Sequence, residues 1–271
     1  MKIGVIADVH SNQIAFRACV DYMIKAGCEE FLLLGDFVSD TAGAKKTMEI
    51  LYELMEQFPC HVLRGNREEY MTEQRKVREQ EEEEKYWIAN SASGNLLYTY
   101  EQLTPKDLDF FENLPITFRY EKEGYPAIIC CHGSPVNTRE LLQLDSERTK
   151  EVLDEIDSDY LLAAHTHYPG MMRYHGKTYM NTGSCGIAIG DPGYAHAVIL
   201  ESWENEWKPE FLRIPYDINQ VIQDIFESGL YDMAPWFLNN NLHIFLTGTD
   251  LTPELVNLAA KLQKENEAEE K

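Results

Sequence analysis

The alternation of short apolar runs with longer amphipathic segments in the first quarter of the chain most constrains its fold. Apolar, β-branched runs at residues 3–7, 31–34 and 60–63 predict three buried strands. The segments between them carry apolar residues at helical spacing, and the first begins at a capping residue, Ser11 or Asn12. Strands separated by helices pair in parallel, so the sequence predicts an α/β sheet.

A polar, acidic segment interrupts the alternation, which then resumes. Residues 68–114 are highly charged with helical spacing, which predicts an inserted helical cap. Residues 217–271 predict a C-terminal helical extension whose last residues, 264–271, are frayed. A helix is predicted at residues 149–156, and strands, some in hairpins, at residues 127–131, 160–164, 171–175, 178–180, 194–200 and 208–214. We therefore expect residues 1–271 to form one domain, with two packed sheets and helices on the outer faces.

Charge and cysteine content exclude several classes of function. A chain of 271 residues with a net charge of −22 does not suit tracking along nucleic acid or binding to anionic membranes, which also disfavours a nuclease acting on polymers. A small phosphorylated substrate is compatible, because bound metal ions can reverse the local field. The six cysteines form no C-x-x-C pair, no signal peptide is evident, and no apolar run reaches the roughly 18 residues of a membrane helix. These features predict a cytoplasmic protein with reduced thiols.

Polar side chains of a few types follow the predicted strands. They are Asp8, His10, Asp36, Asn66, His132, His165 and His167. Ligands bind at the carboxyl ends of the strands in an open α/β sheet, so these side chains are expected at one edge. A lone aspartate there is usually a helix cap and a lone histidine a structural residue, but seven such residues together are difficult to explain in that way. They supply nitrogen and oxygen ligands for two metal ions, which suits Mn, Fe or Zn.

The motifs D-x-H, G-D, G-N-x-E, H-G and H-T-H, in this order, resemble those of the calcineurin-like dinuclear metallophosphoesterases. The resemblance covers residues 1–68 and 127–200, and it implies a four-layer α/β/β/α sandwich with two divalent or trivalent transition metal ions. It also implies the following ligands: Asp8, His10 and His167 for one ion, Asn66, His132 and His165 for the other, and Asp36 as the bridge. Asn66 and His132 would then be catalytic, and a metal-bridged hydroxide would attack phosphorus.

Departures from the family pattern indicate a branch. Ser/Thr protein phosphatases of this superfamily carry Asp-Arg-Gly after the second motif, whereas here Asp36 is followed by Phe-Val-Ser-Asp-Thr. Ala164 also replaces a frequent glycine before H-x-H. The short motifs look more like the bacterial phosphodiesterase and diadenosine-polyphosphate hydrolase branches, which implies a small phosphoester or phosphoanhydride substrate, with a nucleotide among the candidates. The alternatives are a phosphomonoesterase or protein phosphatase, and a non-catalytic protein-binding scaffold of the same fold.

Arg67 occupies the position after Asn66, where many relatives have a histidine that resembles a general acid. A guanidinium does not release its proton near pH 7, so Arg67 cannot serve as that acid. It can bind a phosphate through two parallel hydrogen bonds, or it can pair with Glu68 or Glu69 at the start of the cap helix. If it contacts substrate, weakly basic leaving groups are expected to be preferred.

Several neighbouring residues have two readings. Asn12 can donate to a substrate oxygen or cap a helix. Asp40 can contact a metal ligand from behind or cap a helix, and the cap is the favoured interpretation. Residues 181–186 resemble a loop of small residues that closes the site in this family, although a simple turn is equally compatible. The other histidines are expected to be structural: His61, His175, His196 and His243. The sequence leaves the native metal pair, the substrate and the oligomeric state open.

Overall fold

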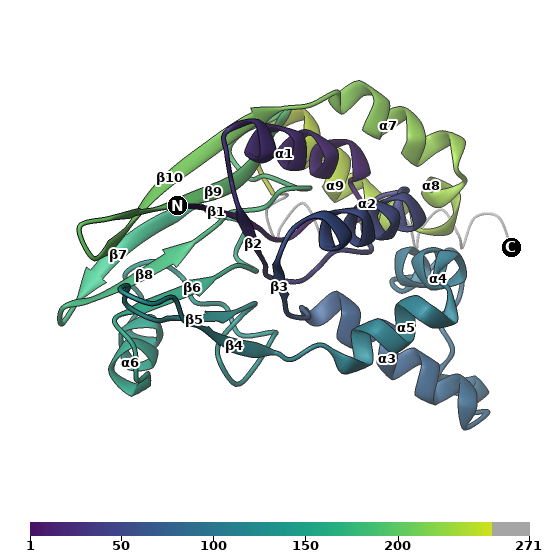
Figure 1. Cartoon of the computed structure of the whole chain (residues 1–271). Coiled ribbons are helices and arrows are strands. Elements are labelled where there is room, and N and C mark those ends of the chain that lie inside the picture. Colours follow the sequence, from purple (N-terminus) through teal and green to yellow (C-terminus); the bar gives the residue numbers. More distant parts are fainter. Residues whose placement is uncertain (251–271) are drawn as a thin grey trace, which may run out of the picture.

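Two five-stranded sheets form the centre of the molecule (Figure 1). The computed structural model describes residues 1–250, so the end of the predicted extension and its frayed tail lie outside the described residues. The first sheet has the order β10-β9-β1-β2-β3 and the second has the order β4-β5-β6-β8-β7. The strands of the first are β1 (Lys2–Ile6), β2 (Glu30–Leu33), β3 (Cys60–Val62), β9 (Tyr194–Trp203) and β10 (Glu206–Pro215). Those of the second are β4 (Thr117–Tyr120), β5 (Ile128–Cys131), β6 (Tyr160–Ala163), β7 (Gly170–Tyr174) and β8 (Lys177–Asn181).

Alternation of side chains along the strands produces the layers. Ile3 and Val5 of β1 lie in the apolar cluster between the sheets, whereas Ile6 lies in the cluster beneath helices α1 (Gln13–Lys25) and α2 (Ala44–Gln57). Helix α6 (Glu147–Glu155) covers the outer face of the second sheet through Val152 and Leu153. The arrangement is the expected α/β/β/α sandwich, which is confirmed.

The parallel strands bring their carboxyl ends to the same region. Strands β1, β2 and β3 pair in parallel, and so do β5, β6 and β8, while the other pairings are antiparallel. The ends of the two sheets are joined, because the backbone N–H of His165 after β6 donates to Oδ2 of Asp8 after β1 at 3.0 Å. The loops that carry the motifs therefore meet where the two sheets meet.

Helices occupy the two segments outside the sandwich. Residues 66–113 contain α3 (Asn66–Glu79), a short 3₁₀ helix (Glu83–Lys85), α4 (Gly94–Gln102) and α5 (Pro105–Asn113). The C-terminal segment contains α7 (Ile218–Glu227), α8 (Leu230–Met233) and α9 (Pro235–Thr247). The two segments touch, because the N–H of Asn90 donates to the carbonyl of Met233 at 2.7 Å. Within residues 1–250, no helix has the length and apolarity needed to cross a bilayer.

Strand β4 is the main element that the sequence reading missed. It is four residues long and forms an antiparallel pair with β5. Its alternating Thr-Phe-Arg-Tyr run, followed by Glu-Lys-Glu-Gly, is a hairpin pattern too short to stand out next to the helical cap.

Candidate metal centre

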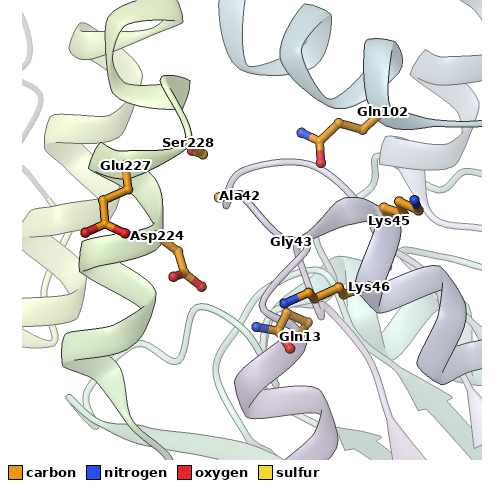
Figure 2. A pocket seen from close by; sticks show the side chains of 9 residues that line it. All are labelled: Gln13, Ala42, Gly43, Lys45, Lys46, Gln102, Asp224, Glu227 and Ser228. Atoms are coloured by element: carbon orange, nitrogen blue, oxygen red, sulfur yellow. The ribbon is translucent and has the colours of Figure 1, made fainter.

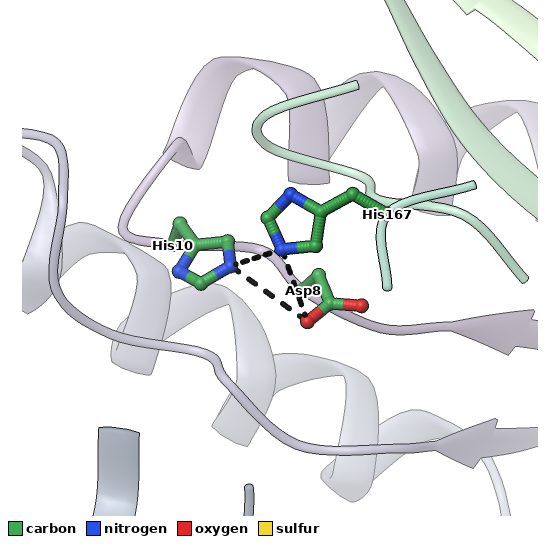
Figure 3. A group of neighbouring side chains, drawn as sticks. All are labelled: Asp8, His10 and His167. Carbon is green, nitrogen blue, oxygen red and sulfur yellow. Dashed lines mark hydrogen bonds and ion pairs between the residues drawn. The ribbon is translucent and has the colours of Figure 1, made fainter. Parts of the chain in front are cut away.

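Six of the strand-end residues form two adjacent groups that could each hold a metal ion. The first group is Asp8, His10 and His167, and the second is Asp36, His132 and His165. In each group one ligand atom per residue lies within 4.8 Å of the others. Figure 3 shows the first group, in which Nε2 of His10 and Nε2 of His167 are 3.0 Å apart and both face the Asp8 carboxylate.

Asp36 lies between the two groups. Its Oδ2 atom is 3.3 Å from Nε2 of His132 and 4.0 Å from Nε2 of His10. Asn66 adjoins the second group, since its Oδ1 atom is 3.2 Å from Nε2 of His132. The seven residues that the motifs singled out are thus within reach of one another, with one carboxylate in contact range of both groups.

The backbone that presents these side chains is strained. Asp8, His10, Asp36, His165 and His167 all have positive φ angles, of 52°, 49°, 54°, 67° and 62°. This left-handed region is uncommon for residues other than glycine, and such strain gathers at functional sites. The surrounding chain is equally tight: a Cβ atom on Gly65 would lie 2.1 Å from Oδ1 of Asp36, so only glycine fits before Asn66.

Each histidine of the first group is oriented by a partner on its far ring nitrogen. Nδ1 of His10 lies 3.0 Å from Oδ2 of Asp40, and Nδ1 of His167 lies 3.0 Å from the carbonyl of Ile187. His132 has the same arrangement, with Nδ1 at 2.8 Å from the carbonyl of Leu34. Such contacts fix the tautomer and turn Nε2 toward a metal. The expectation that Asp40 caps a helix is therefore wrong: α2 is capped by Gly43, and Asp40 is buried beside His10.

The donor set fits metal ions. Oδ1 of Asp8 is buried and has no hydrogen-bond partner, although three imidazole nitrogens lie within 3.8 Å of it. A buried carboxylate oxygen without a donor is costly unless a cation approaches it. Imidazole and carboxylate ligands together suit first-row transition metals.

A sequence comparison decides the family. The model of the calcineurin-like phosphoesterase family matches residues 1–198, which include both ligand groups. The chain belongs to the calcineurin-like phosphoesterases.

Several proteins are similar to this phosphoesterase at low sequence identity. It is 24% identical to the uncharacterized protein MJ0912 of Methanocaldococcus jannaschii over 243 residues, which are 84% of this chain and 93% of that protein. Its fold is similar to that of the hypothetical protein PH1004 from Pyrococcus horikoshii (TM-score 0.75, 19% identity, 92% of this chain and 99% of that one). It is also similar to a metallophosphoesterase from Sphaerobacter thermophilus (TM-score 0.67, 19% identity, 92% and 100%). At this identity the structures establish the fold alone.

The charges of this phosphoesterase's ligands are set by burial and by one another. Burial, reinforced by the charge of the neighbouring His132, lowers the pKa of His165 to about 4. Burial also lowers the pKa of His132, but Asp36 and Asp8 outweigh it and raise the pKa to about 9. Burial raises the pKa of Asp36, yet His132 and His10 hold it at about 2. Asp36 is thus ready to ligate as a carboxylate, whereas metal binding would have to displace a proton from His132.

Arg67 is held beside the ligand groups by an aspartate, not by a glutamate. Its Nη2 atom is 2.8 Å from Oδ2 of Asp40, and its backbone N–H donates to Oδ1 of Asp36 at 2.8 Å. The pairing with Glu68 or Glu69 considered from the sequence is therefore wrong. Burial lowers the pKa of Arg67, but Asp40 and Asp36 outweigh it and raise the pKa above the ordinary arginine value. The Arg67 side chain is 20% exposed, and its guanidinium remains a cation.

The side-chain amide of Asn12 forms hydrogen bonds with backbone atoms of the same chain. Its Oδ1 atom accepts from the N–H of Ala15 at the start of α1, and its Nδ2 atom donates to the carbonyl of Gly186 at 2.8 Å. Asn12 is therefore a helix cap that also anchors the loop at residues 181–186, and both polar atoms of its amide are engaged within the chain. This loop supports β1, because Ser184 Oγ and the N–H of Gly186 both donate to the carbonyl of Asp8.

A cavity of about 480 Å³ adjoins the ligand groups. Its lining includes His165, His167, Asp40 and Arg67, together with side chains of α9, which the sequence reading did not assign to the site. A second cavity of about 400 Å³ lies between α7, α4 and the start of α2 (Figure 2). It contains Lys45, Lys46 and Asp224 but none of the ligand residues, so we place the site at the first cavity.

Proposed function

We propose that this protein is a dinuclear metal-dependent hydrolase of small phosphoesters or phosphoanhydrides. The observation that carries the proposal is the position of Asp36, whose carboxylate is within 4.0 Å of a histidine from each ligand group. One carboxylate within reach of two neighbouring groups suits a pair of closely spaced metal ions. Asp8, His10 and His167 would hold one ion, and Asn66, His132 and His165 the other. Mn, Fe or Zn would suit these ligands.

The reaction replaces one phosphorus–oxygen bond by another. When bound, the two ions would lower the pKa of a water molecule and offset charge on the phosphate oxygens. The water oxygen bonds to phosphorus, the bond to the leaving oxygen breaks, and that oxygen takes up a proton unless it is a weak base. Asn66 contributes a neutral oxygen that adds no charge among the carboxylates. Arg67, fixed by Asp40 at the cavity wall, can donate hydrogen bonds to a phosphate oxygen.

Arg67 predicts a preference among leaving groups. Because it keeps its proton, it cannot supply one to a departing alkoxide, and aryl or phosphate leaving groups should react faster than alkyl groups. We expect Arg67→His to raise kcat/KM for an alkyl ester relative to an aryl ester by about tenfold or more, since general acids typically contribute 10² or above. Arg67→Ala, the control, should lower kcat/KM for both esters without changing their ratio. Fast turnover of alkyl esters by the unaltered protein would contradict this assignment.

Metal content and a substrate panel test the proposed function itself. Protein purified without chelator should contain about two transition metal ions per chain. It should hydrolyse aryl phosphodiesters or dinucleoside polyphosphates when supplied with Mn, Fe or Zn. Fewer than one ion per chain, with no hydrolysis of any compound, would instead support the scaffold alternative.

We also propose that residues 1–271 act as a single domain in the cytoplasm. The contact of the helical cap with the C-terminal helices supports one unit. All six cysteines are free thiols and five are buried, which suits a reducing compartment. The small size of the cavity supports a small phosphorylated substrate, with a nucleotide among the candidates, over a polymer.

A further inference from the structure

The cavity beside the ligand groups is closed on one side by the C-terminal helix α9. Phe237, Asn241 and Ile244 of this helix line the cavity opposite the motif loops. The helix is tied to the site, because Nδ2 of Asn241 donates to the carbonyl of Asp40 at 3.0 Å. A second tie links its C-terminal end to the loop after Ile189, where the N–H of Gly190 donates to the carbonyl of Gly248 at 2.7 Å. This wall lies beyond residue 198, where the family match ends.

One part of the cavity lining is apolar. It consists of Ile187, Ile189, Ile244 and Phe237, with Tyr168 and Leu141 at its edge, whereas Gln143, Thr166, Asn240 and Asn241 add polar side chains. Tyr168 is 52% exposed and Leu141 is 51% exposed, so a bound ligand could cover part of both side chains. A cavity of about 480 Å³ is within the range of sites that take small organic molecules. Apolar and aromatic surface of this kind suits a flat, uncharged ring.

The charges in the cavity limit how many phosphates it can accept. Apart from the two histidines, the lining among residues 1–250 contains one cation, Arg67, and it already pairs with Asp40. The lining also contains Asp250, a second carboxylate. A phosphate held at the ligand groups would be neutralised there, but a second or third phosphate would meet no unpaired cation in the described cavity. The net charge of −22 adds to that cost.

We propose that α9 determines the substrate class of this enzyme: an ester of a single phosphate whose organic group is an aromatic ring, seated against Phe237 and Tyr168. This inference rests on the proposed function and narrows it, because it selects aromatic phosphoesters over polyphosphates. Phe237 and Tyr168 are specificity residues, and neither is a metal ligand. Binding of the ring, more than the chemical step, should depend on them.

The steady-state kinetics of an aromatic phosphodiester test whether Phe237 and Tyr168 bind the ring. For bis(4-nitrophenyl) phosphate, Phe237→Ala should raise KM about tenfold and change kcat less than threefold, since one ring contact is commonly worth about 1–3 kcal/mol. Tyr168→Ala should act in the same direction, and Tyr168→Phe should restore wild-type KM because it keeps the ring. Tyr168 is half exposed, so its removal does not threaten folding. The matched control is Leu246→Ala, which removes a side chain on α9 that is 70% exposed and outside the cavity lining.

Calorimetry with the manganese-loaded protein tests the same inference, with released phosphate measured in each titration so that the heat of binding is separated from the heat of hydrolysis. At fixed free Mn²⁺, adenosine monophosphate and phenyl phosphate should each bind at least about tenfold more tightly than ribose 5-phosphate. Adenosine diphosphate should bind no more than about threefold more tightly than the monophosphate. Equal binding of ribose 5-phosphate, or a diphosphate preference above about tenfold, would overturn the inference. Hydrolysis that is indifferent to Phe237 and Tyr168 would overturn it while leaving the proposed function intact. Ring-dependent binding without hydrolysis of any ester would overturn the proposed function and, with it, the assignment of the ring to a substrate.

Discussion

Replacing Asp36 with asparagine should lower kcat/KM for any accepted substrate by on the order of a thousandfold. Loss of a residue that only orients a metal ligand typically costs 10–100-fold, and a carboxylate within reach of both groups should cost more. Asparagine is the appropriate replacement because residue 36 has a φ of 54°, a conformation that asparagine tolerates and alanine does not. Metal content should fall together with activity, which is measured by elemental analysis of protein purified without chelator.

A matched control shows whether the effect of Asp36→Asn comes from the loss of a metal ligand or from a substitution at a strained backbone position. His175 also has a positive φ, of 48°, but its side chain is 65% exposed and pairs with Asp154 on the surface. His175→Asn should leave both metal content and kcat/KM unchanged. If Asp36→Asn were as active as the unaltered protein at two ions per chain, Asp36 would not be the shared ligand and the dinuclear assignment would be wrong.

The convergence of the candidate ligand residues was predictable because of a simple rule of topology. Parallel strands present their carboxyl ends at one edge, so Asp8, Asp36 and His132 could be brought together from the order of apolar runs alone. Which atoms face one another was beyond that rule. It depends on left-handed backbone at residues such as Asp8 and His165, where the sequence shows no glycine.

The parts of the site that were missed depend on long-range packing. Asp40 lies four residues after Asp36 and reaches His10 and Arg67 because Ser39 and Asp40 itself adopt positive φ angles of 81° and 73°. The spacing of apolar residues in the sequence does not indicate such a turn. The wall formed by α9 is equally invisible in the sequence, since its residues read as an ordinary apolar helix more than 60 residues after His167. Its role follows only from where the helix is docked.

Glu68 is another residue whose role the sequence did not reveal. Among the substitutions proposed for this protein, its replacement should lower the free energy of unfolding most. It is fully buried, and its carboxylate accepts hydrogen bonds from the backbone N–H groups of Asp36, Phe37 and Gly65, each at 2.8 Å. Burial, reinforced by the charge of Asp36, raises the pKa of Glu68 to about 7. The Glu68 side chain thus connects the loop after β2 to the start of α3 through hydrogen bonds.

We expect Glu68→Ala to lower the free energy of unfolding by about 3 kcal/mol or more. The substitution leaves three buried donors without acceptors, and each such group costs about 1–3 kcal/mol. Urea unfolding in the presence of a chelator measures this loss separately from any contribution of bound metal. Glu73→Ala is the control, because Glu73 is 59% exposed and its ion pair with Arg139 lies at the surface, where such pairs contribute little.

Glu68→Gln distinguishes hydrogen bonding from the filling of space. Glutamine has nearly the same volume but only one acceptor oxygen, so its NH₂ group would face at least one backbone donor. It should therefore recover less than half of the stability lost in Glu68→Ala. Full recovery would mean that packing, and not acceptance from three N–H groups, is the contribution of Glu68. Because Asp36 is held by the same carboxylate, metal affinity should fall in the order of stability, with the unaltered protein highest, Glu68→Gln intermediate and Glu68→Ala lowest.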